Sequence, residues 1–271
     1  MKRVVLAAAI VVLAGCTTAE RFREPIASHR APGSSLLQQS AYSVNPHTQR
    51  IVDQHGRERY FHGANVVEKS FPFIPNPDAA WNWNTTFTAK DMQLMQELGL
   101  NAIRLGTMWP GIEPARGVYN STYLSTLSHV VEMASEYGIH SLLDMHQDLM
   151  SEKFCGEGFP LWAVYSNVAD SKFPWPLQPD PFPVDARGVP RVGSCPTHWW
   201  GEYYFTLGVA QGFQHFYDNW NGTLDAWAAA WGEVASVAKG LGAAVLGRAS
   251  ERAVSGRLLQ RSQDHDTACR G

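Results

Sequence analysis

A short apolar run followed by a helical pattern occurs three times along this chain, and this repeat constrains the fold more than any other feature. The apolar runs cover residues 60–67, 101–109 and 139–147. Short runs that alternate with helices are typical of parallel sheets, whose neighbouring strands are joined through helices. The sequence therefore predicts an α/β fold built from successive strand and helix units.

The ends of the first two helices are marked by residues with known capping preferences. The segment from Thr88 to Asp91 has the Thr-x-x-Asp pattern of a helix N-terminus, and Gly99 follows the last apolar position of that helix. A second helical pattern covers residues 123–137 and stops at Gly138. The next apolar run begins close behind each glycine, which is the order expected for a barrel of alternating strands and helices.

The regular order is interrupted after the third apolar run. Residues 149–200 are rich in Pro, Trp and Gly, and a connection of this length predicts a shaped loop over a site. A helical stretch over residues 203–239 follows, and residues 243–247 resemble the start of a fourth strand. The last residues, 248–271, hold five Arg and no aromatic residue, so we expect a disordered tail that is foreign to the fold.

The N-terminus has the layout of an export signal. Two basic residues precede an apolar stretch, so residues 1–16 are predicted to be a signal peptide. The residues up to Cys16 also resemble a bacterial lipobox, which would make Cys16 a site of lipid attachment; the alternative is an ordinary secretory signal cleaved within 17–19. We expect a secreted or extracytoplasmic protein in which residues 17–46 form a polar tether.

Composition and charge argue against two classes of function. The net charge of −3 and the lack of any basic run argue against nucleic acid as a partner. No apolar run approaches the roughly 20 residues that span a bilayer, so no transmembrane span is expected. Apolar residues make up 45% of the chain, which is enough for a buried core.

Two cysteines, Cys155 and Cys195, lie inside the predicted domain. Export to an oxidising compartment favours a disulfide between them. Two buried thiols are the alternative, because spacing alone does not place the Cα atoms within bridging distance. Neither cysteine has a Cys or His neighbour at zinc-ligand spacing, which disfavours a zinc site.

Polar side chains gather at the C-terminal ends of the predicted strands, where barrel enzymes bind their ligands. Lys69 follows the first strand, Arg104 lies in the second, and the third leads into Asp144, His146 and Asp148. An Arg in a buried strand needs a carboxylate partner, and two-residue spacing points the last three side chains to one side of their strand. The alternatives are a structural ion pair for Arg104, a solvated charge for Lys69 and a core histidine for His146.

The remaining acidic residues give weaker signals. The Asp-x-His-x-Asp pattern also suits a divalent metal, but such sites usually take further ligands from later strands, so we expect no metal and no other cofactor. Glu233 lies in a helical pattern, and Glu68 and Glu157 lack a visible partner. We therefore interpret all three as structural.

Five segments of the chain carry a specific family resemblance. They are HGANVVEKSF (62–71), NAIRLGTMWPGIEP (101–114), YNSTYL (119–124), LLDMHQDLMSEKFCGEGFPLWAV (142–164) and FYDNWNG (216–222). These segments are similar to endoglycoceramidases and their close relatives within glycoside hydrolase family 5, and the similarity extends over residues 47–247. The resemblance implies a (β/α)8 TIM-barrel enzyme that hydrolyses O-glycosyl compounds with retention, with a glycolipid or another β-glycoside as its substrate.

The resemblance also implies roles for residues of the predicted site. Arg104 matches the arginine that supports the nucleophile, and His146 matches the histidine that lines the sugar site. Lys69 and Asp148 match positions that hold hydroxyl groups of the glycan.

Aromatic residues and the two cysteines are covered by the same resemblance. Trp199 and Trp200 are candidates for stacking on a sugar face. Aromatic loops at 71–83 and 173–183 could form the walls of a groove for the lipid part of a substrate. A Cys155–Cys195 disulfide is also what this relationship suggests.

The sequence departs from the family at the two catalytic carboxylates. Retaining hydrolases need two carboxyl groups roughly 5 Å apart. Family 5 places one glutamate after strand four, in Asn-Glu-Pro, and the other after strand seven, but residues 243–247 here are followed by Arg-Ala-Ser-Glu-Arg. We therefore expect a barrel truncated after about the fourth strand, without either essential glutamate and inactive as written; a non-catalytic glycan- or glycolipid-binding fragment is the alternative.

Overall fold

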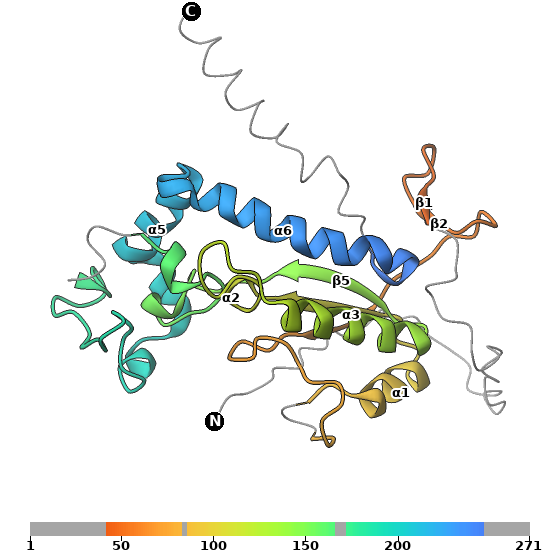
Figure 1. The fold of residues 1–271 in the computed structure, drawn as a ribbon, viewed down its shortest axis with the longest axis horizontal. Coiled ribbons are helices and arrows are strands. Elements are labelled where there is room, and N and C mark those ends of the chain that lie inside the picture. Colours follow the sequence, from red (N-terminus) through yellow and green to blue (C-terminus); the bar gives the residue numbers. More distant parts are fainter. Residues whose placement is uncertain (1–41, 83–85, 166–171, 247–271) are drawn as a thin grey trace, which may run out of the picture.

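The computed structural model describes residues 42–82, 86–165 and 172–246. The expected signal peptide, Cys16 and the expected tail over 248–271 lie outside these residues. In the described part, α3 packs against strand β5 and α6 packs against α3, so both helices run beside one parallel sheet (Figure 1). The α-helices are α1 (Ala89–Glu97), α2 (Trp109–Ile112), α3 (Ser121–Glu136), α5 (Leu207–Tyr217) and α6 (Thr223–Gly240).

The parallel sheet has the order β3-β4-β5. Its strands are β3 (Gly63–Val66), β4 (Ala102–Thr107) and β5 (His140–Met145). They confirm the three predicted strands, although each is shorter than its predicted run. The chain leaves the sheet soon after the last strand residue, and these exits place the polar side chains of the site.

A segment pairs with β5 where the sequence predicts the fourth strand. Residues Gly242–Ala244 form a 3-10 turn (η7), and Val245 then makes a parallel bridge with Ser141 of β5. The backbone N–H of Leu246 donates to the carbonyl oxygen of Ser141 at 2.8 Å. The neighbour of β5 is therefore the segment expected to be the fourth strand.

The predicted helix ends are also present. Asp91 Oδ2 accepts the backbone N–H of Thr88 at 2.9 Å, which closes the capping box at the start of α1. The side chain of Asn120 accepts the N–H of Tyr123 and caps α3, so this helix begins earlier than predicted. Gly99 and Gly138 both take φ = 73°, and both end their helices in the left-handed conformation that glycine adopts at little cost.

The helical stretch predicted over 203–239 is wrong as a single element, because the chain breaks between α5 and α6. Asn219, Asn221 and Gly222 have φ of 54°, 52° and 70°, which no right-handed helix accommodates. Asn enters this region more readily than most residues. The side-chain oxygen of Asn219 also accepts the N–H of Leu224, which satisfies a free donor at the start of α6.

The described residues between 149 and 200 form the long irregular connection that the composition of this segment predicts. Their described part holds three 3-10 turns, η2 (Glu152–Phe154), η3 (Leu161–Ala163) and η4 (Cys195–Thr197). Cys155 and Cys195 form a disulfide, with their Cα atoms 5.5 Å apart. The bond joins the beginning of this connection to its end, where a further 3-10 helix, η5 (Trp200–Phe205), leads into α5.

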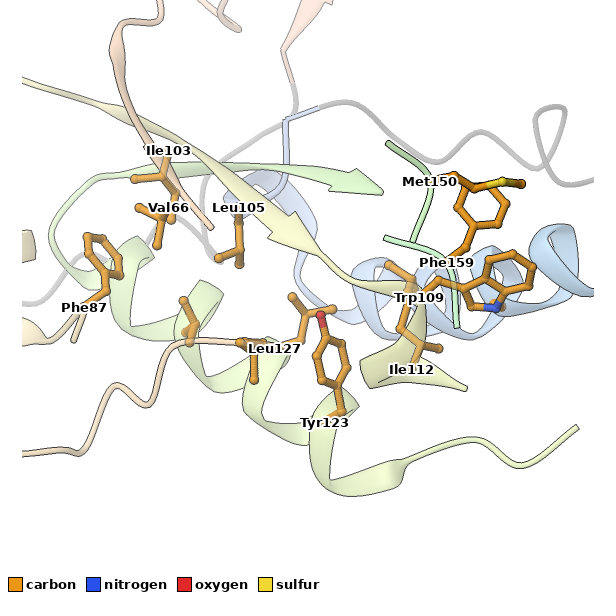
Figure 2. Close-up of a cluster of buried hydrophobic side chains, with 14 of the residues drawn as sticks. Val66, Phe87, Ile103, Leu105, Trp109, Ile112, Tyr123, Leu127, Met150 and Phe159 are labelled. Carbon is orange, nitrogen blue, oxygen red and sulfur yellow. The ribbon is translucent and has the colours of Figure 1, made fainter. Parts of the chain in front are cut away.

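One apolar core fills the space between the sheet and α3 (Figure 2). It continues under the long connection, where the ring of Trp109 lies 5.1 Å from that of Phe159. Trp109 is completely buried, and its indole N–H donates to the carboxylate of the buried Glu113 at 2.8 Å. Trp109 is the last residue of the predicted second strand and is the first residue of α2 in the structure. Pro110 fits in the first turn of α2 because an N–H at this position would have no acceptor within the helix.

A small antiparallel hairpin lies at the opposite end of the sheet from the polar side chains. It consists of β1 (Ser43–Val44) and β2 (Ile51–Val52), and β1 lies inside the range that we expected to be a tether. Tyr42 packs edge-on against His140, with the ring centroids 5.2 Å apart. In the part of the chain that the structure describes, no helix is long and apolar enough to cross a membrane.

Candidate active site

Arg104 and Asp144 form the first ion pair of the site. They lie on the neighbouring strands β4 and β5, and Arg104 Nη2 is 2.6 Å from Asp144 Oδ2. The expected carboxylate partner of Arg104 is therefore present. Because Asp144 lies opposite Gly106, two pairs beyond Arg104 in the register, the guanidinium reaches toward the C-terminal end of the sheet.

His146 lies between two carboxylates. Its Nδ1 is 3.3 Å from Asp144 Oδ2, and its Nε2 is 3.3 Å from Asp148 Oδ2. The histidine side chain is only 12% exposed, so its two ring nitrogens depend on these partners. The Asp-x-His-x-Asp spacing thus brings all three side chains together, as predicted.

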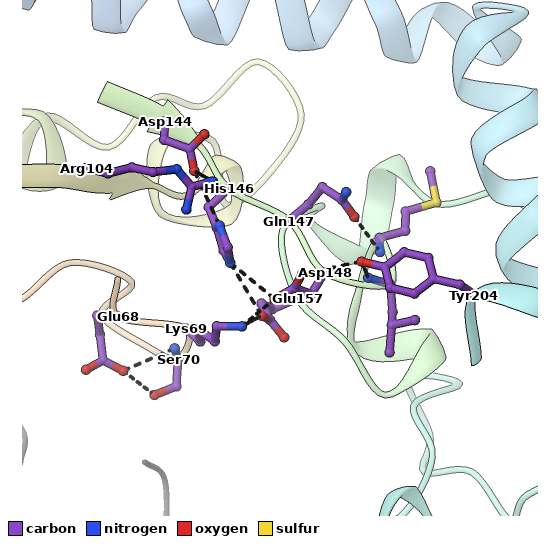
Figure 3. A network of polar contacts seen from close by, with 12 residues as sticks. Glu68, Lys69, Ser70, Arg104, Asp144, His146, Gln147, Asp148, Glu157 and Tyr204 are labelled. Carbon is purple, nitrogen blue, oxygen red and sulfur yellow. Dashed lines mark hydrogen bonds and ion pairs between the residues drawn. The ribbon is translucent and has the colours of Figure 1, made fainter. Parts of the chain in front are cut away.

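Lys69 closes the cluster from the loop after β3 (Figure 3). Its Nζ lies 2.5 Å from Asp148 Oδ2 and 2.5 Å from Glu157 Oε1. The side chains thus form a chain of alternating charge that begins at Arg104 and ends at Lys69. Lys69 is therefore not merely a solvated charge, because its ammonium forms ion pairs with both Asp148 and Glu157.

Glu157 is the residue of this cluster that sequence reasoning missed. The sequence shows no partner for it and predicts a structural role, but in the structure Glu157 contacts Lys69 and lies 3.8 Å from His146 Nε2. Glu157 and Asp148 exchange two backbone hydrogen bonds of 2.8 and 2.9 Å, which bring residues nine positions apart to the same place. The glycines that flank Glu157 were the only sequence signal of such a tight loop.

The electrostatics of the cluster follow from burial and these contacts. The pKa of His146 is raised to about 9 by Asp144 and then Asp148, so the ring is an imidazolium at neutral pH. Burial alone would raise the pKa of Asp148, but hydrogen bonds from His146 and Lys69 lower it. Burial raises the pKa of Glu157 against the opposing effect of Lys69. The pKa of Lys69 is raised because its hydrogen bonds to Asp148 and Glu157 outweigh its desolvation.

The aromatic candidates lie beside this cluster. Tyr204 donates its hydroxyl to Asp148 Oδ1 at 3.4 Å, and the ring of Trp200 is 5.8 Å from that of Tyr204. Trp199 and Trp200 remain 68% and 50% exposed, so a large part of each residue is open to solvent. Glu68 instead accepts hydrogen bonds from Ser70.

The cluster also contains a group that resembles a metal site. Ligand atoms of His146, Asp148 and Glu157 all lie within 4.8 Å of one another. The ammonium of Lys69 already contacts both carboxylates, and its positive charge would repel a cation at the same place. The donor set therefore fits an internal ammonium better than a metal ion.

Comparison with known proteins shows which family this chain is similar to. Residues 52–174 match the family described as Cellulase (glycosyl hydrolase family 5). The chain is 53% identical over 194 residues to an endoglycoceramidase of Cyanea nozakii, a match that covers 71% of this chain and 38% of the relative. An endoglycoceramidase of Hydra vulgaris is 47% identical over 198 residues, covering 73% of this chain and 38% of the relative. The resemblance to endoglycoceramidase-like family 5 glycosidases is confirmed.

A solved structure agrees with this family. Endo-glycoceramidase II from Rhodococcus sp., in its complex with ganglioside GM3, has a TM-score of 0.50 and 27% identity. The match covers 72% of this chain and 40% of that chain. Family 5 and this likeness imply the (β/α)8 barrel, to which the described residues contribute three parallel strands and the fourth position. The chain spans about two fifths of the length of these relatives.

Proposed function

We propose that this chain provides the glycan-binding side of a retaining family 5 O-glycosidase that resembles endoglycoceramidases in releasing a glycan from a glycolipid. The observation that carries the proposal is the alternating-charge cluster at the C-terminal ends of three parallel strands. Barrel enzymes bind their substrates at this end of the sheet. A sugar hydroxyl both donates and accepts hydrogen bonds. A cluster that holds donors and acceptors side by side in fixed positions is therefore suited to bind it.

Each residue of the cluster has a proposed role. Lys69 and Asp148 contact hydroxyl groups of the glycan, and the half-exposed side chain of Lys69 supports this role. His146 lines the sugar site and holds Asp148 through the contact of its Nε2 with Oδ2. Arg104 orients Asp144 here and supports the nucleophile in a complete barrel.

The aromatic residues form the proposed apolar side of the site. Trp199 and Trp200 offer exposed ring faces on which a sugar can stack, next to the polar cluster. The loops at 71–83 and 173–183 are the proposed walls of a groove for the lipid part. Exposed rings at Phe71 and Trp175 support this assignment.

We further propose that the 271 residues by themselves bind glycan without cleaving it. The printed sequence has no Asn-Glu-Pro after the fourth strand position, where the family carries its acid/base. Retaining hydrolysis needs both carboxyl groups, roughly 5 Å apart on the two sides of the scissile bond. Glycan or glycolipid binding without catalysis is therefore the second candidate function, and the described polar cluster favours it.

A binding and hydrolysis assay on the purified chain tests both parts. We expect a soluble β-lactoside to bind, and Lys69→Met and Asp148→Asn each to weaken binding at least about tenfold. Lys239→Met, which removes an exposed lysine at the end of α6, should bind normally. Equal binding by all variants would contradict the assigned site, and release of glycan from lactosylceramide would contradict the absence of cleavage.

A nucleotide-level experiment addresses the catalytic residues. Sequencing the transcript and the genomic DNA across the Gly247 codon, with translation in all three frames, shows whether another frame continues with Asn-Glu-Pro. If it does, the longer product should be assayed as a retaining glycosidase.

We also propose that the protein is exported, and that it is either held at a membrane face through lipid on Cys16 or released after cleavage within 17–19. The basis is the export-signal pattern of residues 1–16. Mass spectrometry of the mature N-terminus distinguishes a lipid-modified Cys16 from an unmodified chain that begins within 17–19.

A further inference from the structure

The contacts of Lys69 leave one of its hydrogen-bond donors for a ligand. An ammonium group has three N–H donors. One of them donates to Asp148 Oδ2, and Glu157 Oε1 lies 2.5 Å from the same nitrogen as an ion pair. The two contacts together restrict where the ammonium can lie. The lysine side chain is 48% exposed, so these partners do not enclose it.

Glu157 is held in place by its backbone as well as by its charge. It exchanges two backbone hydrogen bonds with Asp148, and the flanking glycines make this close approach possible. A Cβ at Gly156 would collide with the carbonyl oxygen of Asp148, and one at Gly158 would collide with Gln147. The loop is therefore built to bring a second carboxylate beside the one that the sequence already indicated.

The burial of Glu157 argues against an incidental surface contact. Its side chain is only 16% exposed, and a carboxylate removed from water to this extent needs a compensating cation. Lys69 is that cation, and His146 Nε2 is the next positive group, at 3.8 Å from Glu157 Oε1. Asp148, in contrast, is shared among Lys69, His146 and Tyr204, so it alone cannot fix the direction of the ammonium.

We infer that Glu157 is a positioning residue that holds the ammonium of Lys69 where a remaining N–H can donate to a hydroxyl group of the bound glycan. This inference rests on the glycan-binding function proposed above and adds a residue to it. Without Glu157, the flexible lysine stem would pivot about Asp148 alone. The glycan would then meet a mobile donor and would lose the hydrogen bond that a fixed ammonium provides.

The test compares Glu157→Gln and Glu157→Asp with a matched control. Glu157→Gln keeps the shape and removes the charge, whereas Glu157→Asp keeps the charge on a shorter stem that Lys69 can follow. Glu152→Gln removes a more exposed glutamate of the same loop, which lies 3.5 Å from Arg187. The ligand probe is methyl β-lactoside, and its affinity is measured by titration calorimetry at one pH for all variants.

A spectroscopic measurement reports on Lys69 itself. The chain has six lysines, so ¹⁵N labelling of lysine gives few ammonium signals, and Lys69→Met identifies that of Lys69. We expect Glu157→Gln to weaken glycan binding about tenfold and to shift or remove the Lys69 signal. Glu157→Asp should bind within about threefold of the original chain, and Glu152→Gln should match the original chain in both measurements.

The outcomes separate this inference from the proposed function. If the original chain binds the lactoside but Glu157→Gln binds equally well with an unchanged Lys69 signal, the positioning role is wrong and the binding function stands. If the original chain does not bind the lactoside, the proposed function fails first. Should Glu157→Gln be unfolded, Glu157→Asp decides, because a loss of binding with an intact Lys69 signal would overturn the inference.

Discussion

Raising the pH is expected to destabilise this chain through His146. The pKa of this residue is about 9 in the folded chain and 6.5 in its ordinary state, because Asp144 and Asp148 favour the protonated ring. A raised pKa means that the folded state binds the proton more tightly than the unfolded state. Its stabilising contribution is therefore complete below pH 6.5 and is lost as the pH rises through about 9.

The size of this effect follows from the same difference in pKa. A change of one pKa unit corresponds to about 1.4 kcal/mol, so the full difference corresponds to about 3 kcal/mol. The cluster is partly solvated, and screening reduces the expected contribution to roughly 1–2 kcal/mol. Guanidinium denaturation at about pH 6 and about pH 9.5 measures the free energy of unfolding across this window.

A His146→Gln variant isolates this contribution from the other titrating groups. The original chain should lose roughly 1–2 kcal/mol more than the variant between the two pH values. ¹⁵N spectra of the ring should place the His146 titration well above that of an exposed histidine. Parallel stability curves for the two proteins would refute the reasoning, since they would show that the ring is not held as an imidazolium.

Three further perturbations test the packing that supports the site. Replacing Cys155 and Cys195 by Ser should lower the free energy of unfolding by about 4 kcal/mol, judged from the 40-residue separation, and an unchanged denaturation midpoint would contradict this. Gly158→Ala should cost roughly 1–3 kcal/mol, since φ is 126° and the new Cβ would collide with Gln147, and the melting temperature reports it. Trp109→Ala should cost roughly 3–5 kcal/mol because the ring is completely buried, and a loss below about 1 kcal/mol would refute that placement.

Much of the fold could be predicted because its signals are local. The capping box from Thr88 to Asp91 and the helix-ending Gly99 and Gly138 depend on residues that are close in the chain. The break at Asn219 could not be predicted in the same way. Asparagine is compatible with both a helix and a left-handed turn, and the choice here is made together with the start of α6.

The candidate site shows the same division. Asp144, His146 and Asp148 were brought together by two-residue spacing, which a strand and its extension preserve. Glu157 could not be placed, because its position depends on a loop that folds back on Asp148. The contact between Lys69 and Glu157 depends on the same loop. It joins segments that are far apart in the sequence, so the sequence alone could not predict it.

The disulfide has a consequence for the behaviour of the chain after proteolysis. It joins the loop that carries Glu157 to the segment that carries Trp199 and Trp200, although the two cysteines are 40 residues apart in sequence. A single cut between Cys155 and Cys195 would leave both pieces covalently connected. Such a nicked molecule would migrate as one band without reductant and as two bands with it, and its polar and aromatic sides would separate only after reduction.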